Sequence, residues 1–98
     1  MKLIAAAGFN LARQKTIFFG KITKGGVNRA VAMEEFASGK GINFCRALTC
    51  HGKAESLLIQ FCGGENGSRI DAALAVEGMP FHSVAVPGKT RCCTTCLD

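Results

Sequence analysis

The residues best suited to chemistry in this sequence lie in a glycine loop, Ser-Gly-Lys-Gly at positions 38–41, which runs directly into an apolar, amphipathic stretch. Glycines let a backbone approach a ligand closely, and the first N–H groups of a helix attract anions. Lys40 lies in the first predicted helical turn, where the helix dipole disfavours a cation. The lysine is better explained if an anion lies in front of the loop. The alternative is a plain helix start with Ser38 as N-cap.

Two segments match nucleotide-binding motifs only in part. The glycine loop fails as a dinucleotide fingerprint because Phe44 takes the place of the third glycine. Residues 86–90, Val-Pro-Gly-Lys-Thr, contain the end of a P-loop, but Ser83 stands where its first glycine is needed. A P-loop also needs a following helix to hold the phosphates, and the next residues favour a strand. We therefore predict a turn between two strands at residues 86–90.

The cysteines and a second glycine segment carry weaker signals. Cys93 and Cys96 have the C-x-x-C spacing of redox and zinc sites, yet on a strand they point to opposite faces and no second ligand pair accompanies them. We predict small buried thiols there and keep a redox or zinc protein as a third class. The segment Gly-Gly-Glu-Asn-Gly at 63–67 is either a helix-capping loop or a functional loop through Glu65 and Asn66.

Composition limits the classes of function. The 98 residues allow one small domain, and the net charge of +5 comes from scattered lysines and arginines without a run of like charge. This pattern argues against a nucleic-acid arm or a polybasic membrane patch and suits a small anionic substrate. The apolar start is too short for a signal peptide, and no segment is long enough to span a bilayer. We expect a cytoplasmic protein with reduced thiols.

The expected elements alternate between strands and helices, which predicts an α/β fold with a parallel sheet and right-handed crossovers. Residues 15–36 read as a hairpin that leaves this sheet, as does the last strand. Gly52 and Gly78 are the expected helix stops. The chain ends in mid-strand, so we expect the front portion of a larger protein. The expected strands cover 2–8, 15–20, 27–36, 54–64, 79–86 and 90–98, and the expected helices cover 42–52 and 66–78.

Several of these segments, taken together and in this order, resemble the PfkB group of carbohydrate kinases, which have the ribokinase-like fold. The closest branch is 1-phosphofructokinase and tagatose-6-phosphate kinase, and the likeness is to their N-terminal portion. The Ser-Gly-Lys-Gly-Ile-Asn stretch is similar to the family's G-G-K-G-I-N signature. The matching segments are 25–48, 63–74, 77–81, 87–91 and 97–98.

The resemblance implies a Rossmann-like three-layer α/β/α sheet with a small β lid, incomplete in this chain. The lid strands would lie at about 15–36 and 89–98, and the α/β core at 1–8 and 39–86. In many relatives the lid also forms a homodimer. Gly39 and Asn43 would line the sugar site, and Lys40 and Arg91 would contact the phosphate of a phosphosugar. Arginine offers a planar fork to phosphate oxygens, and a lysine at a helix N-terminus adds charge.

Two departures from the family pattern qualify the resemblance. The family's first loop reads Asn-Pro-Ala-x-Asp, but Gln14 stands where that aspartate holds sugar hydroxyls. The Gly-x-Gly-Asp motif, which supplies the catalytic Asp, does not occur in these residues. ATP and Mg²⁺ would therefore be bound mainly by the C-terminal half of the kinase, and this segment alone is predicted to be inactive.

The functional prediction follows from these points. The parent protein would phosphorylate a hydroxyl of a phosphosugar with ATP, as 1-phosphofructokinases do, and this chain would supply the sugar-phosphate site and the lid. The alternative is a non-catalytic fragment that binds a sugar phosphate or dimerises.

Overall fold

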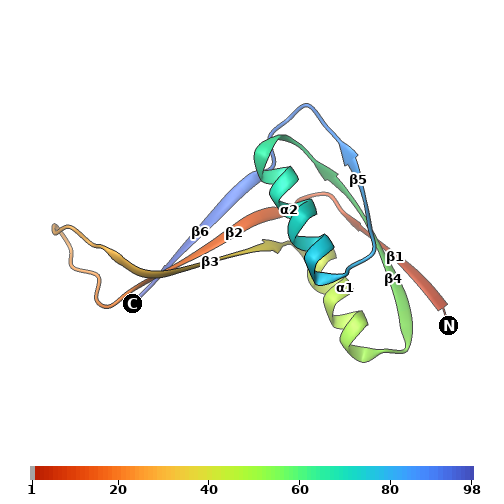
Figure 1. The fold of residues 1–98 in the computed structure, drawn as a ribbon, viewed down its shortest axis with the longest axis horizontal. Coiled ribbons are helices and arrows are strands. Elements are labelled where there is room, and N and C mark those ends of the chain that lie inside the picture. The colour runs from red at the N-terminus through yellow and green to blue at the C-terminus, as the bar shows by residue number, and fades with distance from the viewer. Residues whose placement is uncertain (1) are drawn as a thin grey trace.

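The computed structural model describes residues 2–98 (Figure 1). They form two helices and six strands, and the strands are divided between two separate sheets. The elements in chain order are β1 (Lys2–Gly8), β2 (Ala12–Phe19), β3 (Ala30–Ser38), α1 (Lys40–His51), β4 (Ala54–Cys62), α2 (Gly64–Glu77), β5 (Phe81–Ala85) and β6 (Arg91–Leu97).

The core sheet has the order β1-β4-β5, and all its strands are parallel. Central strand β4 alternates, with Leu58 and Cys62 buried on one face and Ile59 and Phe61 exposed on the other. Both helices pack on the buried face, because each helix presents an apolar stripe at helical spacing. The residues that make this core are Leu11, Ala37, Ile42, Cys45, Leu58, Cys62, Ile70, Leu74 and Met79.

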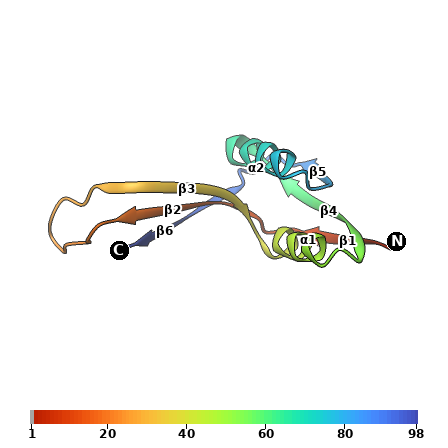
Figure 2. The ribbon, with the colours of Figure 1, turned by 60° about the horizontal axis from the view of Figure 1, so that its bottom comes forward.

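The second sheet has the order β3-β2-β6 and extends away from the helices (Figure 2). Strand β2 is antiparallel to β3 and parallel to β6. Its outer part has no covering layer, so apolar side chains remain exposed on it, among them Val31, Met33 and Leu97. The molecule is accordingly elongated, with extents of 53 × 34 × 19 Å.

The two sheets meet at three connections that lie close together. The chain passes from the core sheet to the second sheet between Gly8 and Ala12 and again between Ala85 and Arg91, and it returns between Ser38 and Lys40. Ala12 at the start of β2 pairs with Ser38 at the end of β3 and with Arg91 at the start of β6. The inner ends of all three strands therefore lie side by side, and β2 begins four residues beyond the end of β1. The sheet junction therefore brings three distant parts of the sequence together.

The prediction of an α/β fold with a parallel sheet is confirmed, here with both helices on one face of the core sheet. The turn predicted at residues 86–90 is confirmed too, since β6 and not a helix follows it. Both helices end where predicted, at Gly52 and Gly78.

Several details of the prediction were wrong. Both helices begin two residues earlier than predicted, at Lys40 and Gly64. Strand β2 begins at Ala12 and not at Lys15, because it pairs on both sides from Ala12 onward. Strand β3 begins at Ala30 and not at Val27, because the side chain of Asn28 closes a turn by hydrogen bonds to the backbone of Thr23. The thiols of Cys93 and Cys96 were expected to be buried. They point to opposite faces as predicted, but Cys93 is half-buried and Cys96 exposed, because β6 is an edge strand.

Candidate functional site

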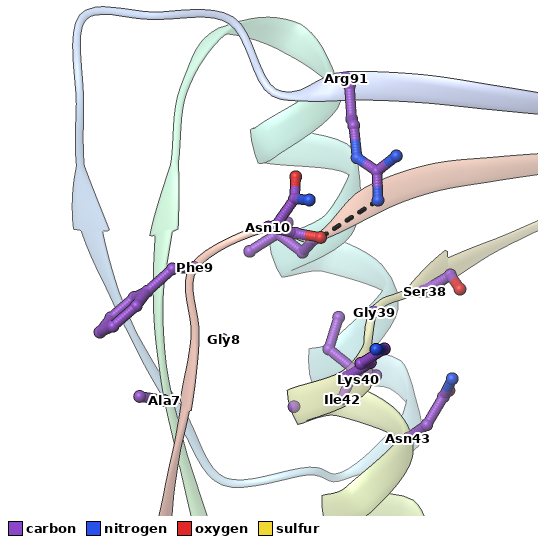
Figure 3. A pocket seen from close by; sticks show the side chains of 12 residues that line it. Ala7, Gly8, Phe9, Asn10, Ser38, Gly39, Lys40, Ile42, Asn43 and Arg91 are labelled. Atoms are coloured by element: carbon purple, nitrogen blue, oxygen red, sulfur yellow. Dashed lines mark hydrogen bonds between the residues drawn. The ribbon is translucent and has the colours of Figure 1, made fainter.

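A cavity of about 450 Å³ opens at the sheet junction, beside the carboxyl end of β1 and the amino end of α1 (Figure 3). Ligand sites in open α/β sheets lie at the carboxyl ends of the strands, so this is the expected place for one. Three segments form its wall: residues 7–11 after β1, residues 38–43 around the start of α1, and Arg91 at the start of β6.

Two glycines make this wall possible. Gly39 has φ 152°, a value that disfavours other residues, and a Cβ there would lie 3.1 Å from the Cα of Leu11. A Cβ on Gly41 would lie 3.0 Å from the Cα of Gly8. The glycine loop is therefore pressed against the connection between β1 and β2, with no room for side chains between them. This is why the Gly-Lys-Gly sequence falls at this point of the chain.

The start of α1 faces the cavity without an internal cap. Gly39 occupies the N-cap position and no side chain caps the helix, so the alternative of Ser38 as N-cap is wrong. The first turn contains no acidic residue. The first N–H groups of a helix have no partner within the helix, and they give its amino end a partial positive charge. Lys40, Gly41 and Ile42 carry these groups and line the cavity.

Two cationic side chains add to this positive end. Lys40 lies in the first turn of α1, and Arg91 reaches the cavity from β6 on the opposite wall (Figure 3). The Nη2 of Arg91 donates to the backbone oxygen of Asn10 at 3.2 Å, which orients the guanidinium. Within residues 2–98 neither cation pairs with a carboxylate. Their charge is therefore available to an anionic ligand.

Asn43 is the neutral polar group of the first turn, and Arg46 positions it. The Nη1 of Arg46 donates to the Oδ1 of Asn43 at 3.1 Å, while its Nε and Nη2 hold Glu77 of α2 at 2.7 and 2.8 Å. The Nη2 also donates to the backbone oxygen of Ala37 at 2.7 Å. The hydrogen bond from Arg46 lowers the pKa of Glu77. With the Asn43 carbonyl oxygen oriented in this way, its amide N–H groups are left to bind a ligand.

Four of the five predicted site residues line the cavity, and one does not. Gly39, Lys40, Asn43 and Arg91 all line the cavity, although Arg91 is far from the others in sequence. Gln14 does not line it. The Nε2 of Gln14 donates to the Oγ1 of Thr95 at 3.0 Å and to the backbone oxygen of Lys15 at 3.0 Å, on the surface of the second sheet.

Two polar residues that line the cavity, Asn10 and Ser38, were not among the predicted site residues. Asn10 lies on the wall, two residues beyond the end of β1, and its backbone holds Arg91. Its place directly after the first buried strand is the signal that could have identified it, because such positions meet at the ligand-binding edge of a parallel sheet.

The cysteines lie outside this cavity. All six cysteines are free, and burial raises the pKa of the Cys62 thiol to about 11, which keeps it protonated and unreactive. In the described part of the chain no three His, Cys, Asp or Glu side chains are grouped so as to hold a metal ion. None of the helices described is long and apolar enough to cross a membrane.

Comparison with known proteins gave matches among solved structures only. No family model matches the sequence, and no curated protein sequence matches it.

The structural matches are sugar kinases. A phosphofructokinase candidate from Staphylococcus aureus is 32% identical to the chain with a TM-score of 0.80, over 96% of this chain and 30% of that protein. Phosphofructokinase-2 from Escherichia coli, in complex with fructose-6-phosphate, is 26% identical with a TM-score of 0.82, over 93% and 30%. A possible 1-phosphofructokinase from Thermotoga maritima is 25% identical with a TM-score of 0.76, over 90% and 29%. The chain thus spans about 30% of the length of the first of these structures.

Proposed function

Because this chain matches the PfkB-like carbohydrate kinases in fold over about 30% of their length, we propose that it supplies the sugar-phosphate site and lid of such a kinase. The kinase would transfer a phosphoryl group from ATP to a hydroxyl of a phosphosugar, with fructose 1-phosphate or a relative as substrate. The observation that carries the proposal is the junction cavity, where two unpaired cations and an uncapped helix N-terminus converge.

Each wall of the cavity has a role in this proposal. Arg91 and Lys40 approach from opposite walls and together neutralise the phosphate of the sugar, Arg91 through its planar fork and Lys40 as a point charge. Gly39 lines the sugar site through its backbone, and the amide of Asn43 donates to a hydroxyl. We retain Gln14 as a hydroxyl ligand, which requires that it exchange its bond to Thr95 for one to the sugar.

We propose that the second sheet is the lid, with its strands at about 15–36 and 89–98 and the α/β core at 1–8 and 39–86. The sheet joins the core directly at the cavity, so any closure of the sheet would exclude water from the bound sugar. Its exposed apolar residues, such as Val31, Met33 and Leu97, would become buried if two copies of the chain paired through their lids. A homodimer is therefore part of this proposal.

ATP and Mg²⁺ are assigned elsewhere. The residues described here do not offer a carboxylate cluster for a metal, so we derive no step through Mg²⁺ in this chain. We propose that both are bound mainly by the part of the kinase that this chain does not span, and that residues 1–98 alone do not transfer phosphate. The free thiols suit a reducing compartment, and we place the protein in the cytoplasm.

The second candidate is a non-catalytic module that binds a sugar phosphate or dimerises. The same cavity and the same exposed sheet support it, because neither feature requires turnover. The two candidates differ in activity and not in the ligand.

Calorimetric titration of residues 1–98 tests the shared site. We expect fructose 6-phosphate, fructose 1-phosphate or tagatose 6-phosphate to bind more tightly than unphosphorylated fructose. Lys40→Ala and Arg91→Ala should each weaken phosphosugar binding by about 1–3 kcal/mol, because each removes a charge-assisted hydrogen bond. Lys53→Ala is the matched control, since Lys53 is exposed near the opposite end of the core sheet. Equal affinity of the wild type, Lys40→Ala and Arg91→Ala would contradict the site.

A further inference from the structure

Arg13 makes a polar connection between the second sheet and the core that the proposed site does not use. Its Nη2 donates to the Oε1 of Glu35 on β3 at 2.7 Å, and its Nη1 donates to the Oδ1 of Asn66 on α2 at 3.1 Å. Asn66 lies 53 residues further along the chain and belongs to the core. One guanidinium therefore joins the second sheet to helix α2 of the core.

The connection continues to the residue before Arg91. The Nδ2 of Asn66 donates to the backbone oxygen of Thr90 at 2.9 Å. Thr90 is also held at its other polar groups: its N–H donates to the oxygen of Gly63 at 2.9 Å, and its Oγ1 accepts from the N–H of Gly63 at 2.9 Å. The position at which β6 leaves the core is thus fixed by the first turn of α2, and Arg13 is attached to the same turn.

The burial of Arg13 argues for a role in orientation more than in stability. Its side chain is only 14% exposed, and its Nε is buried without a hydrogen-bond partner in the part of the chain that is described. A buried charge with an unsatisfied donor is costly, and an apolar residue of the same size would often be as stable. Polar groups in such places can instead select one arrangement among several.

Other contacts hold only the inner end of the second sheet. Besides the three chain connections, α2 packs against β2 and β3, α1 packs against β3, and Arg46 of α1 donates to the backbone oxygen of Ala37 on β3, while the outer parts of the strands are exposed. If the second sheet rotated against the core, Arg91, the first residue of β6, would move relative to Lys40 on α1. The distance between the two cations of the cavity therefore depends on the angle between the sheets.

We propose that Arg13 is a positioning residue, which fixes the orientation of the second sheet against α2 and thereby sets Arg91 against Lys40 across the cavity. The effect on ligand binding rests on the proposed function, whereas the effect on sheet orientation does not. Asn66 links the two, since it accepts a hydrogen bond from the guanidinium of Arg13 and donates one to the backbone oxygen of Thr90.

Residual dipolar couplings of the 98-residue chain test the orientation directly. In the wild type, the amides of both sheets should fit one alignment tensor. In Arg13→Gln, the second sheet should require a different tensor or show reduced couplings, because the bridge to Glu35 and Asn66 is lost. Arg69→Gln is the matched control, since Arg69 lies on α2 as Asn66 does, but within residues 2–98 its ion pair is with exposed Glu65 on the same helix. A single tensor in Arg13→Gln, unchanged from the wild type, would overturn the proposal.

The affinity for fructose 6-phosphate gives the second readout. Arg13→Gln should bind roughly 3- to 30-fold more weakly than the wild type although Arg13 does not line the cavity, and Arg69→Gln should bind like the wild type. If the wild type binds no phosphosugar, the proposed function fails, and the couplings alone decide the positioning role.

If Arg13→Gln does not fold, Asn66→Asp replaces it. This variant keeps an acceptor for Arg13 but removes the donor to the Thr90 oxygen. It should speed hydrogen exchange at the Thr90 amide and displace β6 in the couplings. Wild-type exchange and couplings in Asn66→Asp would equally overturn the proposal.

Discussion

The core sheet and the second sheet have the same number of strands but are held in different ways. In the core sheet, Leu58 is 0% exposed, as is Leu74 of the covering helix α2, and the helices cover one face of the central strand β4. In the second sheet, Val31 is 72% and Met33 55% exposed, and the outer strands have no cover. The core sheet is stabilised by apolar burial, whereas the second sheet is fixed where its inner end meets the core. The cavity lies at that meeting point, so the sheet that buries less apolar surface carries one wall of the candidate site.

The largest expected difference between the two regions is in the cost of removing an apolar side chain. Leu58→Ala should lower the free energy of unfolding by about 2–5 kcal/mol, since it leaves a cavity in the packed core. Met33→Ala removes a side chain of similar size from an exposed strand and should change stability by less than about 0.5 kcal/mol. Urea unfolding measures both. Equal losses would show that the second sheet is as well packed as the core.

Glycine substitutions at the junction should have the next largest effect. A Cβ on Gly63 would overlap the backbone oxygen of Gly88, so Gly63→Ala must push the loop before β6 away from α2. We expect a loss of about 1–3 kcal/mol in thermal or urea unfolding, as for other overpacked sites. Gly88→Ala is the matched control because nothing lies within 4 Å of a Cβ there. A tolerated Gly63→Ala would mean that the two elements are not in close contact.

The smallest expected effect concerns pH and the pair of Arg46 with Glu77. The hydrogen bond from Arg46 lowers the pKa of Glu77 below its ordinary value of 4.5. The pair therefore contributes fully above pH 4.5, and its contribution is lost as the pH falls through the lower pKa of the folded state. Because both side chains are partly exposed, the contribution should be no more than about 1 kcal/mol.

The free energy of unfolding, measured against pH, checks this prediction. The wild type should lose a small increment of stability at acid pH that Glu77→Gln lacks. Parallel curves for the two proteins would show that the pair contributes nothing. Such a result would leave Arg46 only its contacts with Asn43 and Ala37.

Local patterns in the sequence predicted most of the core. The helical spacing of Ile42, Cys45, Leu48 and Thr49, and of Ile70, Ala73 and Leu74, predicts the inward faces of the two helices. Ile42, Cys45, Ile70 and Leu74 are buried, whereas Leu48 and Ala73 are half-buried and Thr49 is exposed. The loop before α1 was predicted from its residue types, because glycines on both sides of a lysine at a helix start indicate a backbone that a ligand can approach.

Features that depend on contacts between distant residues could not be predicted. The bridge from Arg13 to Asn66 joins residues 53 positions apart, and neither has a local pattern that indicates the other. The side to which Gln14 points depends on the register of β2 with β6, which pairs it with Cys93. The start of β2 likewise depends on partners from the other end of the chain. Long-range register, more than secondary structure, is what the sequence left open.

The central claim is that the phosphate of a sugar binds at the junction, in front of α1. A titration of the ¹⁵N-labelled chain with fructose 6-phosphate, followed by amide chemical shifts, tests it most directly. The account predicts the largest shifts at residues 39–43, Asn10 and Arg91, and smaller shifts for equal concentrations of fructose. Shifts confined to another part of the surface, such as the crevice beside Gly52 and Pro80 at the opposite end of the core sheet, would contradict it. So would shifts at the junction that are equal for the two sugars.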